Sequence, residues 1–378
     1  MKFKIWRALP KFKNHEKGSA LILVIIFMAL AAAVVPPMLS YMGTGLKTGI
    51  IYEENTKELY AAESGIEDAL WTIMNDTPDD YPYSYQLEEY INEKDVIVEI
   101  EDLGMVFKIT STATSDDNSG TVVECYAMYP ITMYDLAAAS LDGDLTITGN
   151  TEIDSSPDLE QADIYANGDI VLDGKVKVYG DGTAVGDINM SGQSEITGNV
   201  TEHSPPLIFE EIDTSKYLEE ADEGFPVHHD LSITTSCTLG PTHIHGDLDI
   251  SSTSNVTLAG TVWVDGSLTM SGSSHVEGAG TIVAVEDMTI TGGGELQPDD
   301  LPSFISTTGS ITTTGNQRVY AVLYAPNGVA TISGTSGIYG AVTGKSVIIE
   351  TSSTLTYGLE LAGRSSRGDL KIVSYLIR

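Results

Sequence analysis

Residues 246–256 read GDLDISSTSNV, and residues 266–276 read GSLTMSGSSHV, 20 positions further along the chain. Both stretches begin with glycine and place apolar side chains at the third, fifth and eleventh positions, with small or polar residues between them. Alternating apolar residues face one side of a short β-strand, and glycine suits a tight corner because it has no Cβ. The pattern therefore predicts two short strands joined by a corner.

The same pattern returns through the C-terminal two thirds of the chain. The eleventh position is apolar in all nine copies, which begin at Gly143, Gly168, Gly186, Gly246, Gly266, Glu286, Gly309, Gly328 and Lys345. A unit of about 20 residues cannot bury its own apolar face, whereas stacked units share one continuous core. We therefore predict a parallel β-solenoid over residues 136–362. An antiparallel sandwich or an up-and-down barrel is the alternative, although neither fold requires one fixed spacing.

One interval between copies, the third to the fourth, is much longer than the others. It holds Pro205-Pro206, an acidic stretch at Asp213–Asp222 that is typical of a helix, and His228-His229. We interpret residues 201–242 as an insertion that leaves the solenoid at one corner. We expect residues 363–378 to form a final strand. It would pair with the last solenoid unit or with a second sheet and would cover an open edge.

A small sheet is predicted before the solenoid, in residues 77–135. Residues Asp95–Glu101, Met105–Thr112 and Thr121–Tyr129 are rich in strand-forming residues and are separated by turn signals. We expect three antiparallel strands. The fold class predicted for the whole chain is mainly β, with an N-terminal helix, this small antiparallel sheet and the β-solenoid.

The N-terminal segment has the composition of a membrane helix. Residues 1–17 hold six basic side chains, and no charged residue occurs from Ser19 to Leu46. The apolar run Ser19–Val35 would span about 26 Å as a helix, close to the ~30 Å of a bilayer core. Basic residues before such a span stay in the cytoplasm, which places the remainder outside. We expect Pro36-Pro37 to interrupt the helix, because proline lacks the amide donor.

A second, amphipathic helix pattern follows and extends the predicted helical region over residues 19–76. The apolar side chains that recur at helical spacing are Leu59, Ala62, Ile66, Ala69, Leu70 and Ile73. The acidic residues expected on the polar face are Glu53, Glu54, Glu58, Glu63 and Glu67. This half of the helix is predicted to lie on a globular head.

Three interpretations of the N-terminal segment remain open from the residues. A secretory signal would be cut after Ala31-Ala32-Ala33, and a plain membrane anchor would stay uncut. Lys17-Gly18-Ser19, followed at once by an apolar helix, resembles a type IV prepilin leader. That resemblance implies that a prepilin peptidase cuts between Gly18 and Ser19, removing residues 1–18 and retaining the helix. Cleavage there would change the net charge from −35 to −40.

A further stretch, residues 59–70 (LYAAESGIEDAL), resembles PilX-type minor pilins. Residues Tyr320–Gly344 also resemble an uncharacterised domain that is commonly attached to PilX-type amino termini. One position departs from the pattern, since most major pilins carry glutamate at the fifth residue after the cut, where this chain has Leu23. The resemblance implies other pilin subunits, the prepilin peptidase and the cytoplasmic membrane as partners, and a final location in an extracellular filament or at the cell surface.

The charge excludes some classes of ligand. The chain has 19 Lys+Arg against 54 Asp+Glu, so it repels phosphate backbones and is not expected to bind nucleic acid. Residues 218–317 contain no lysine or arginine, which disfavours an anionic ligand there. The two cysteines, Cys125 and Cys237, are too few for a disulfide framework and could be paired or free.

Candidate chemistry is sparse. His243 and His245 share one side of a predicted strand and could hold a metal with His228 or His229, but Ile244 is expected to point inward and leave both histidines solvated. Recurring aspartates suit turns better than calcium ligands, and these are Asp144, Asp169, Asp187, Asp247 and Asp287. Adjacent carboxylates at Glu219-Glu220 and Asp299-Asp300 could form an acid–base pair but are expected by chance in acidic loops. Arg367-Gly368-Asp369 matches an integrin-binding tripeptide that is also common by chance. We expect no catalytic residue, no metal and no cofactor.

The sequence therefore predicts a non-enzymatic minor pilin-like subunit that displays a β-solenoid head for assembly initiation or for adhesion to a surface or glycan. The alternative is a membrane-tethered extracellular β-helix protein that binds or modifies carbohydrate. A third hypothesis is a self-polymerising solenoid scaffold that resembles a bactofilin.

Overall fold

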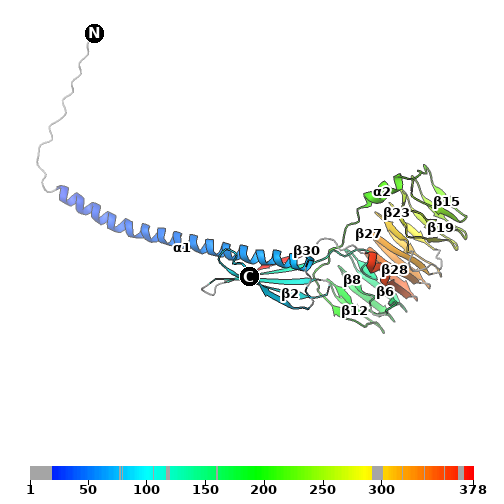
Figure 1. The fold of residues 1–378 in the computed structure, drawn as a ribbon, viewed down its shortest axis with the longest axis horizontal. Helices are drawn as coiled ribbons and strands as arrows, with labels where there is room; N and C mark the ends of the chain where they lie inside the picture. Colours follow the sequence, from blue (N-terminus) through cyan, green and yellow to red (C-terminus); the bar gives the residue numbers. More distant parts are fainter. Residues whose placement is uncertain are drawn as a thin grey trace, which may run out of the picture.

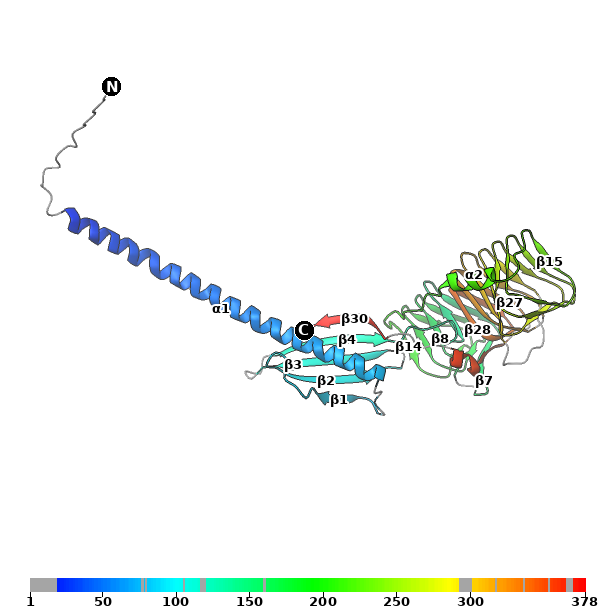
Figure 2. The same ribbon diagram turned by 45° about the horizontal axis from the view of Figure 1, so that its top comes forward.

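The computed structural model describes residues 19–75, 78, 80–104, 106–115, 120–158, 161–291, 301–316, 318–335, 337–352, 354–364 and 370–378. A long N-terminal helix leads to a small antiparallel sheet, and a parallel β-solenoid follows at the opposite end of the sheet (Figures 1 and 2). The predicted fold class is confirmed.

Helix α1 is continuous from Ser19 to Asn75. The expected interruption at Pro36-Pro37 is therefore wrong, since both prolines lie inside the helix. The proline φ near −65° is itself helical, so the helix can continue if it gives up the hydrogen bonds that these two residues cannot donate. The carbonyls of Ala32 and Ala33 lose these donors, and the turns on either side keep the helical path.

The second half of α1 packs on the small sheet. The sheet order is β1 (Tyr83–Gln86), β2 (Asp95–Asp102), β3 (Phe107–Thr114), β4 (Gly120–Met128) and β30 (Lys371–Ile377), and all neighbours are antiparallel. The three strands predicted from the sequence are present, and β1 and β30 extend the sheet on both sides. The last strand, β30, pairs with β4, so the C-terminal tail returns to the small sheet and not to the solenoid.

The solenoid has three faces, each a row of short parallel strands, which we call faces A, B and C. Face A carries the third and fifth positions of the repeat. Its stacking order is β12 (Ile188–Met190), β9 (Ile170–Gly174), β6 (Leu145–Gly149), the ends of β28 (Gly337–Thr351) and β27 (Val319–Gly334), β26 (Ile311–Thr313), β24 (Met288–Ile290), β21 (Leu268–Met270), β18 (Leu248–Ile250) and β15 (Leu231–Ile233).

Face B carries the eleventh position, and the described residues form it in two parts. The first part is β13 (Glu195–Ile196), β10 (Lys177–Val178), β7 (Glu152–Ser156), β29 (Thr354–Gly358) and the starts of β28 and β27. The second part is β22 (His275–Glu277), β19 (Asn255–Leu258) and β16 (Cys237–Leu239). The eleventh-position residue Leu296 falls outside the described residues.

Face C completes each turn. Its order is β14 (Val200–Thr201), β11 (Gly182–Ala184), β8 (Ile164–Ala166), β5 (Ala138–Ser140), the middle of β28 and of β27, β25 (Ser303–Ser306), β23 (Thr281–Ala284), β20 (Val262–Val264) and β17 (Thr242–Ile244).

The turns do not stack in sequence order. The first face A strand, β6, pairs with the last one, β28, from Leu145↔Val347 to Gly149↔Thr351. From this central junction the chain builds three turns toward the small sheet, crosses the length of the solenoid, and winds back from the distal end. The distal end is the turn of β15, β16 and β17. This turn, residues 231–244, is a unit that the nine-copy alignment did not contain.

The crossing segment, residues 202–230, covers face C. Its helix α2 (Thr214–Asp222) begins after Asp213, whose side chain accepts a hydrogen bond from the Ser215 amide. Most outward side chains of face C are buried, among them Tyr165, Trp263, Ile305 and Tyr324. The side chains that pack against them from the crossing segment include Ile212, Tyr217 and Leu218. Face C is thus apolar on both sides, because the solenoid core lies behind it and the crossing segment lies in front.

The two cysteines are free and lie in different parts of the molecule. Cys125 is buried in the core of the small sheet, and Cys237 is exposed on β16 at the distal end of the solenoid. Burial raises the pKa of the Cys125 thiol to about 11.

Because the thiolate is the reactive form, we expect iodoacetamide at pH 8 to label Cys237 and leave Cys125 unmodified until the protein is unfolded. Labelling counted by intact mass, with Cys237→Ser as the control, checks this prediction. Equal labelling of both thiols in the native protein would contradict it.

Candidate functional site

The first half of α1 is a large exposed apolar surface. Every residue from Leu21 to Glu53 is exposed, and the exposed side chains include Leu21, Ile22, Leu23, Val24, Ile25, Ile26 and Phe27. Among the described residues this is the one helix long and apolar enough to cross a membrane. Figure 2 shows this half of the helix projecting away from the small sheet. A soluble protein rarely exposes an apolar surface of this size, so the segment requires lipid or other apolar helices around it.

The second half of α1 is fixed to the small sheet. Ala62, Ile66, Ala69 and Ile73 are buried against β2, β3 and β4, as the amphipathic pattern predicts. Gly65 lies at the closest approach, because a Cβ built on it would be 2.2 Å from the Ser111 Oγ of β3. The glycine of the ESGIE stretch therefore allows the helix to contact the sheet directly.

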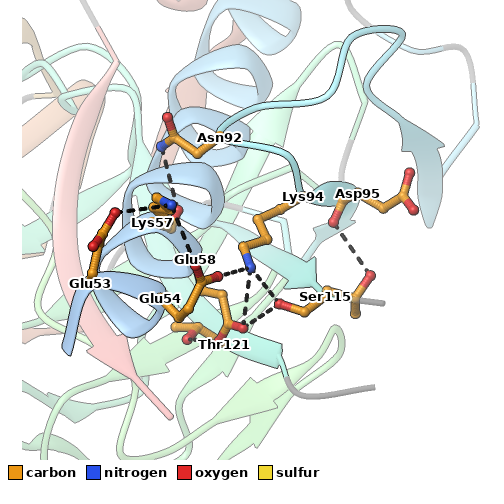
Figure 3. A network of polar contacts seen from close by, with 10 residues as sticks. Glu53, Glu54, Lys57, Glu58, Asn92, Lys94, Asp95, Ser115 and Thr121 are labelled. Carbon is orange, nitrogen blue, oxygen red and sulfur yellow. Dashed lines mark hydrogen bonds and ion pairs between the residues drawn. The ribbon is translucent and has the colours of Figure 1, made fainter. Parts of the chain in front are cut away.

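A polar cluster joins α1 to the sheet where the exposed half of the helix ends (Figure 3). Lys94 is buried, and its Nζ donates hydrogen bonds to Glu54 Oε2 at 2.7 Å and to Ser115 Oγ at 2.7 Å. Ser115 Oγ in turn donates to Glu58 at 2.5 Å, and Thr121 also donates to Glu58. Glu58 was expected on the solvated face of the helix and is instead 5% exposed. Its charge lies 3.9 Å from Lys94 Nζ, which offsets the cost of burying it.

A second cluster of titratable groups lies at the distal end of the solenoid. Ile244 is fully buried as expected, but the expectation that both histidines are solvated is wrong for His243, which is 8% exposed. His243 Nδ1 lies 2.6 Å from Asp222 Oδ1 of α2, and its Nε2 lies 2.9 Å from Asp265 Oδ1. His245 Nδ1 lies 2.9 Å from the other oxygen of Asp265. His243 is buried because α2 covers this part of face C.

The electrostatics of this cluster follow from its geometry. Burial alone would lower the pKa of His243, but the hydrogen bonds to Asp265 and Asp222 outweigh burial and raise it. Asp265 shows the complementary effect, since burial acts to raise its pKa and the contacts with His243, His245 and Trp263 lower it. The ring of His228 stacks on His245 at a centroid distance of 5.2 Å.

The recurring aspartates bind backbone, as the interpretation of turn-forming residues predicts. Four of the five, all except Asp187, accept a hydrogen bond through the side chain from an amide of the next turn of the stack, and Asp230 of the distal turn does the same. The pairs are Asp169 N to Asp144, Asp187 N to Asp169, Asp247 N to Asp230, Ser267 N to Asp247, and Ser310 N to Asp287. These carboxylates therefore link turns along the corner that precedes face A.

Face A presents a regular polar surface. Between its third and fifth positions, which are buried in most turns, lies one outward residue per turn, in the stacking order Asn189, Val171, Thr146, Ile348, Thr331, Thr312, Thr289, Thr269, Asp249 and Ser232. Adjacent strands in a sheet lie about 4.8 Å apart, so the five threonines form a ladder of evenly spaced hydroxyl groups with one interruption at Ile348.

Other predicted site residues are not brought into a functional arrangement, or fall outside the described residues. The Glu220 carboxylate accepts hydrogen bonds from the backbone amide and the hydroxyl of Thr261, and so it connects α2 to the solenoid. Gly18, Asp299-Asp300 and Arg367-Gly368-Asp369 lie outside the described residues, and Ser19 is the first residue of α1.

Sequence reasoning missed Lys94, Asp222 and Asp265. The repeat carried a signal for Asp265, because His245 and Asp265 each follow the aligned residues Ile244 and Val264 on neighbouring turns. Asp222 and Lys94 belong to segments outside the repeat and carried no such signal.

Comparison with known proteins gives one family match. Residues 187–364, just under half of the chain, match the model of a domain of unknown function (DUF7305). The matched region runs from the third turn through the crossing segment to the last turn, and it includes the Tyr320–Gly344 stretch. No curated protein matches the chain.

Two solved structures are similar at low scores. The competence-associated pilin ComZ from Thermus thermophilus has 10% sequence identity and a TM-score of 0.29, with 85% of this chain and 97% of ComZ covered. The ice-binding protein from the Antarctic ascomycete Antarctomyces psychrotrophicus has 17% identity and a TM-score of 0.24, with 60% of this chain and 95% of that protein covered. TM-scores this low do not establish a shared fold.

Proposed function

We propose that this chain is a non-enzymatic, PilX-like minor pilin subunit that carries a β-solenoid beyond the cell envelope. The observation that carries the proposal is the division of α1 into two halves. Its first half exposes apolar side chains on all sides, and its second half is fixed on an antiparallel sheet. A helix of this kind can be held by lipid before assembly and by other apolar helices afterwards, because both surroundings are apolar.

The N-terminal sequence supports the direction of insertion and the retention of the helix. The six basic residues before Gly18 favour a cytoplasmic N-terminus. Cleavage between Gly18 and Ser19 by a prepilin peptidase would leave Ser19 as the first residue of α1. The mature subunit would then begin with the apolar helix itself.

The mature N-terminus is the decisive measurement. We expect the protein from its native membranes or filaments to begin at Ser19, as determined by mass spectrometry of the intact chain and of its N-terminal peptide. The control is Gly18→Leu, which removes the residue before the cut and is expected to retain residues 1–18. A native chain that begins at Val34 and is freely soluble would establish plain secretion instead. A native chain that retains Met1 would establish an uncut anchor.

A second candidate function is suggested by face A. Its evenly spaced hydroxyl groups point outward, with Thr269 exposed and the other four threonines half-buried, and such a row could contact an extended polysaccharide. In this alternative, the solenoid is a carbohydrate-binding head tethered to the membrane. The test is binding of the full chain, in detergent, to a glycan array. The alternative is favoured if the chain binds a glycan, if the double variant Thr269→Tyr/Thr289→Tyr loses that binding, and if the mature N-terminus is not Ser19.

A further inference from the structure

The histidine cluster at the distal end of the solenoid is separate from α1 and from the surface of face A. It combines two turns of the stack with helix α2 of the crossing segment. His243 and His245 come from β17, Asp265 follows β20, and Asp222 ends α2. Ligand atoms of His243, His245 and Asp265 all lie within 4.8 Å of one another.

We propose that His243, His245 and Asp265 form a binding site for a divalent transition-metal ion of the zinc class. Two imidazole nitrogens and a carboxylate oxygen are the donor set that zinc accepts, and calcium and magnesium prefer oxygen ligands alone. Small side-chain movements bring the three atoms to the ~2.0–2.2 Å metal distances of such a site. The fourth position is left to water.

The surroundings of His243 match those of a metal ligand. Its Nδ1 lies 2.6 Å from Asp222 Oδ1, which leaves Nε2 directed toward Asp265, whose other oxygen contacts His245. A histidine that binds a metal through one nitrogen commonly donates its other N–H to a carboxylate, and this contact fixes the tautomer and the ring orientation. The indole N–H of Trp263 donates to Asp265 Oδ1 at 3.1 Å and holds that carboxylate in place.

The charge of the region favours a cation. No lysine or arginine occurs in residues 218–317, so no fixed basic side chain in this stretch neutralises Asp222 and Asp265. The His228 ring, stacked on His245 with an interplanar angle of 3°, restricts the orientation of the second ligand. Both histidines are therefore oriented before an ion binds.

A bound ion would connect three segments that are distant in the sequence. Asp222 is the last residue of α2 and contacts the ligand His243. His243 and His245 belong to the distal turn, and Asp265 belongs to the next turn. An ion that binds the folded chain and not the unfolded chain stabilises the folded state by mass action. The site would thus secure the crossing segment at the distal end of the solenoid, where no further turn among the described residues stacks on β15, β16 and β17.

The test uses the full chain in detergent, stripped with a chelator and then titrated with zinc chloride. We expect one zinc per chain by elemental analysis and a rise in the thermal midpoint with zinc concentration. Cobalt(II) in place of zinc should give the visible absorption bands of a four-coordinate site. We expect His245→Ala to weaken zinc binding at least 100-fold and Asp222→Asn to weaken it about 10-fold. Calcium and magnesium should not compete.

Two further measurements keep the proposal falsifiable. His203→Ala removes an exposed histidine far from the cluster and should leave zinc binding unchanged. Far-UV circular dichroism checks that His245→Ala and Asp222→Asn remain folded. Zinc binding that is absent, that survives His245→Ala in the folded protein, or that is equally displaced by calcium would overturn the proposal.

Discussion

The substitution Gly340→Ala is expected to destabilise the solenoid by about 3–5 kcal/mol, combining the cost of a strained backbone with that of a clash in a packed core. Gly340 has a φ of +146°, a conformation that side chains with a Cβ rarely adopt. A Cβ at this position would lie 1.9 Å from the carbonyl oxygen of Ala321. Ala321 pairs with Gly340 across β27 and β28, so neither backbone can move without breaking the ladder.

The location of Gly340 makes the effect extend through the molecule. β28 joins the turns that wind back from the distal end to the first turns, through β5 and β6. If β28 loses its pairing, the two groups of turns are no longer joined. Urea unfolding of the full chain in detergent, followed by far-UV circular dichroism, should show a lower midpoint for the β signal. Limited proteolysis should show new cleavage within residues 319–351.

Gly43→Ala is the matched control for this experiment. Gly43 lies on the exposed half of α1 with no atom within 4 Å of its Cβ position. Alanine favours helices over glycine by about 1 kcal/mol, so no loss of stability is expected there. A Gly340→Ala protein that unfolds at the wild-type urea concentration would show that the junction between β27 and β28 is not as tight as described.

The units of the solenoid could be predicted from the sequence, but their order could not. The apolar positions of each repeat are set by local alternation, which is why residues such as Leu145, Ile250 and Met288 point inward as expected. The order of turns is set by which edges meet, and the edge of β6 meets the edge of β28, some 200 residues later. The spacing of the repeats along the chain contains no information about the pairing of β6 with β28.

Face C shows a signal in the sequence that the repeat pattern did not use. Strands such as β20 (VWV) and β23 (TIVA) are apolar at consecutive positions, whereas face A strands alternate. Continuous apolar strands indicate burial on both sides. The sequence of face C therefore contained the prediction that another segment covers it, although it did not identify residues 202–230 as that segment.

The polar sites depended on tertiary contacts. His243 was expected to be solvated because its own strand gives no reason to bury it, and α2 covers it only after the crossing segment has folded along face C. Glu58 lies on a helix face that the periodicity assigns to solvent, yet Ser115 and Thr121 from the sheet donate hydrogen bonds to it. In both cases a buried polar side chain is compensated by residues from a distant segment.

The second large effect is expected from Lys94→Met, which keeps most of the side-chain volume and removes the charge. The Lys94 side chain is 6% exposed, as is that of Glu58, and Lys94 Nζ lies 2.7 Å from Glu54 and 3.9 Å from Glu58. Removing one partner of a buried ion pair leaves the remaining charge poorly compensated and costs about 3–5 kcal/mol. We therefore expect a lower urea midpoint, and faster amide hydrogen exchange in the part of α1 that contains these glutamates.

Two variants separate the loss of charge from the loss of packing. Lys216→Met removes a lysine whose side chain is 79% exposed and 3.8 Å from Asp213, and exposed pairs contribute only ~0–1 kcal/mol, so little change is expected. Adding Glu58→Gln to Lys94→Met removes the buried carboxylate that lost its cation, and should recover part of the stability. If the double variant is less stable than Lys94→Met alone, the cluster acts through hydrogen bonding to Glu58 and not through charge. In that case the junction between α1 and the sheet would depend on Ser115 and Thr121 more than on Lys94.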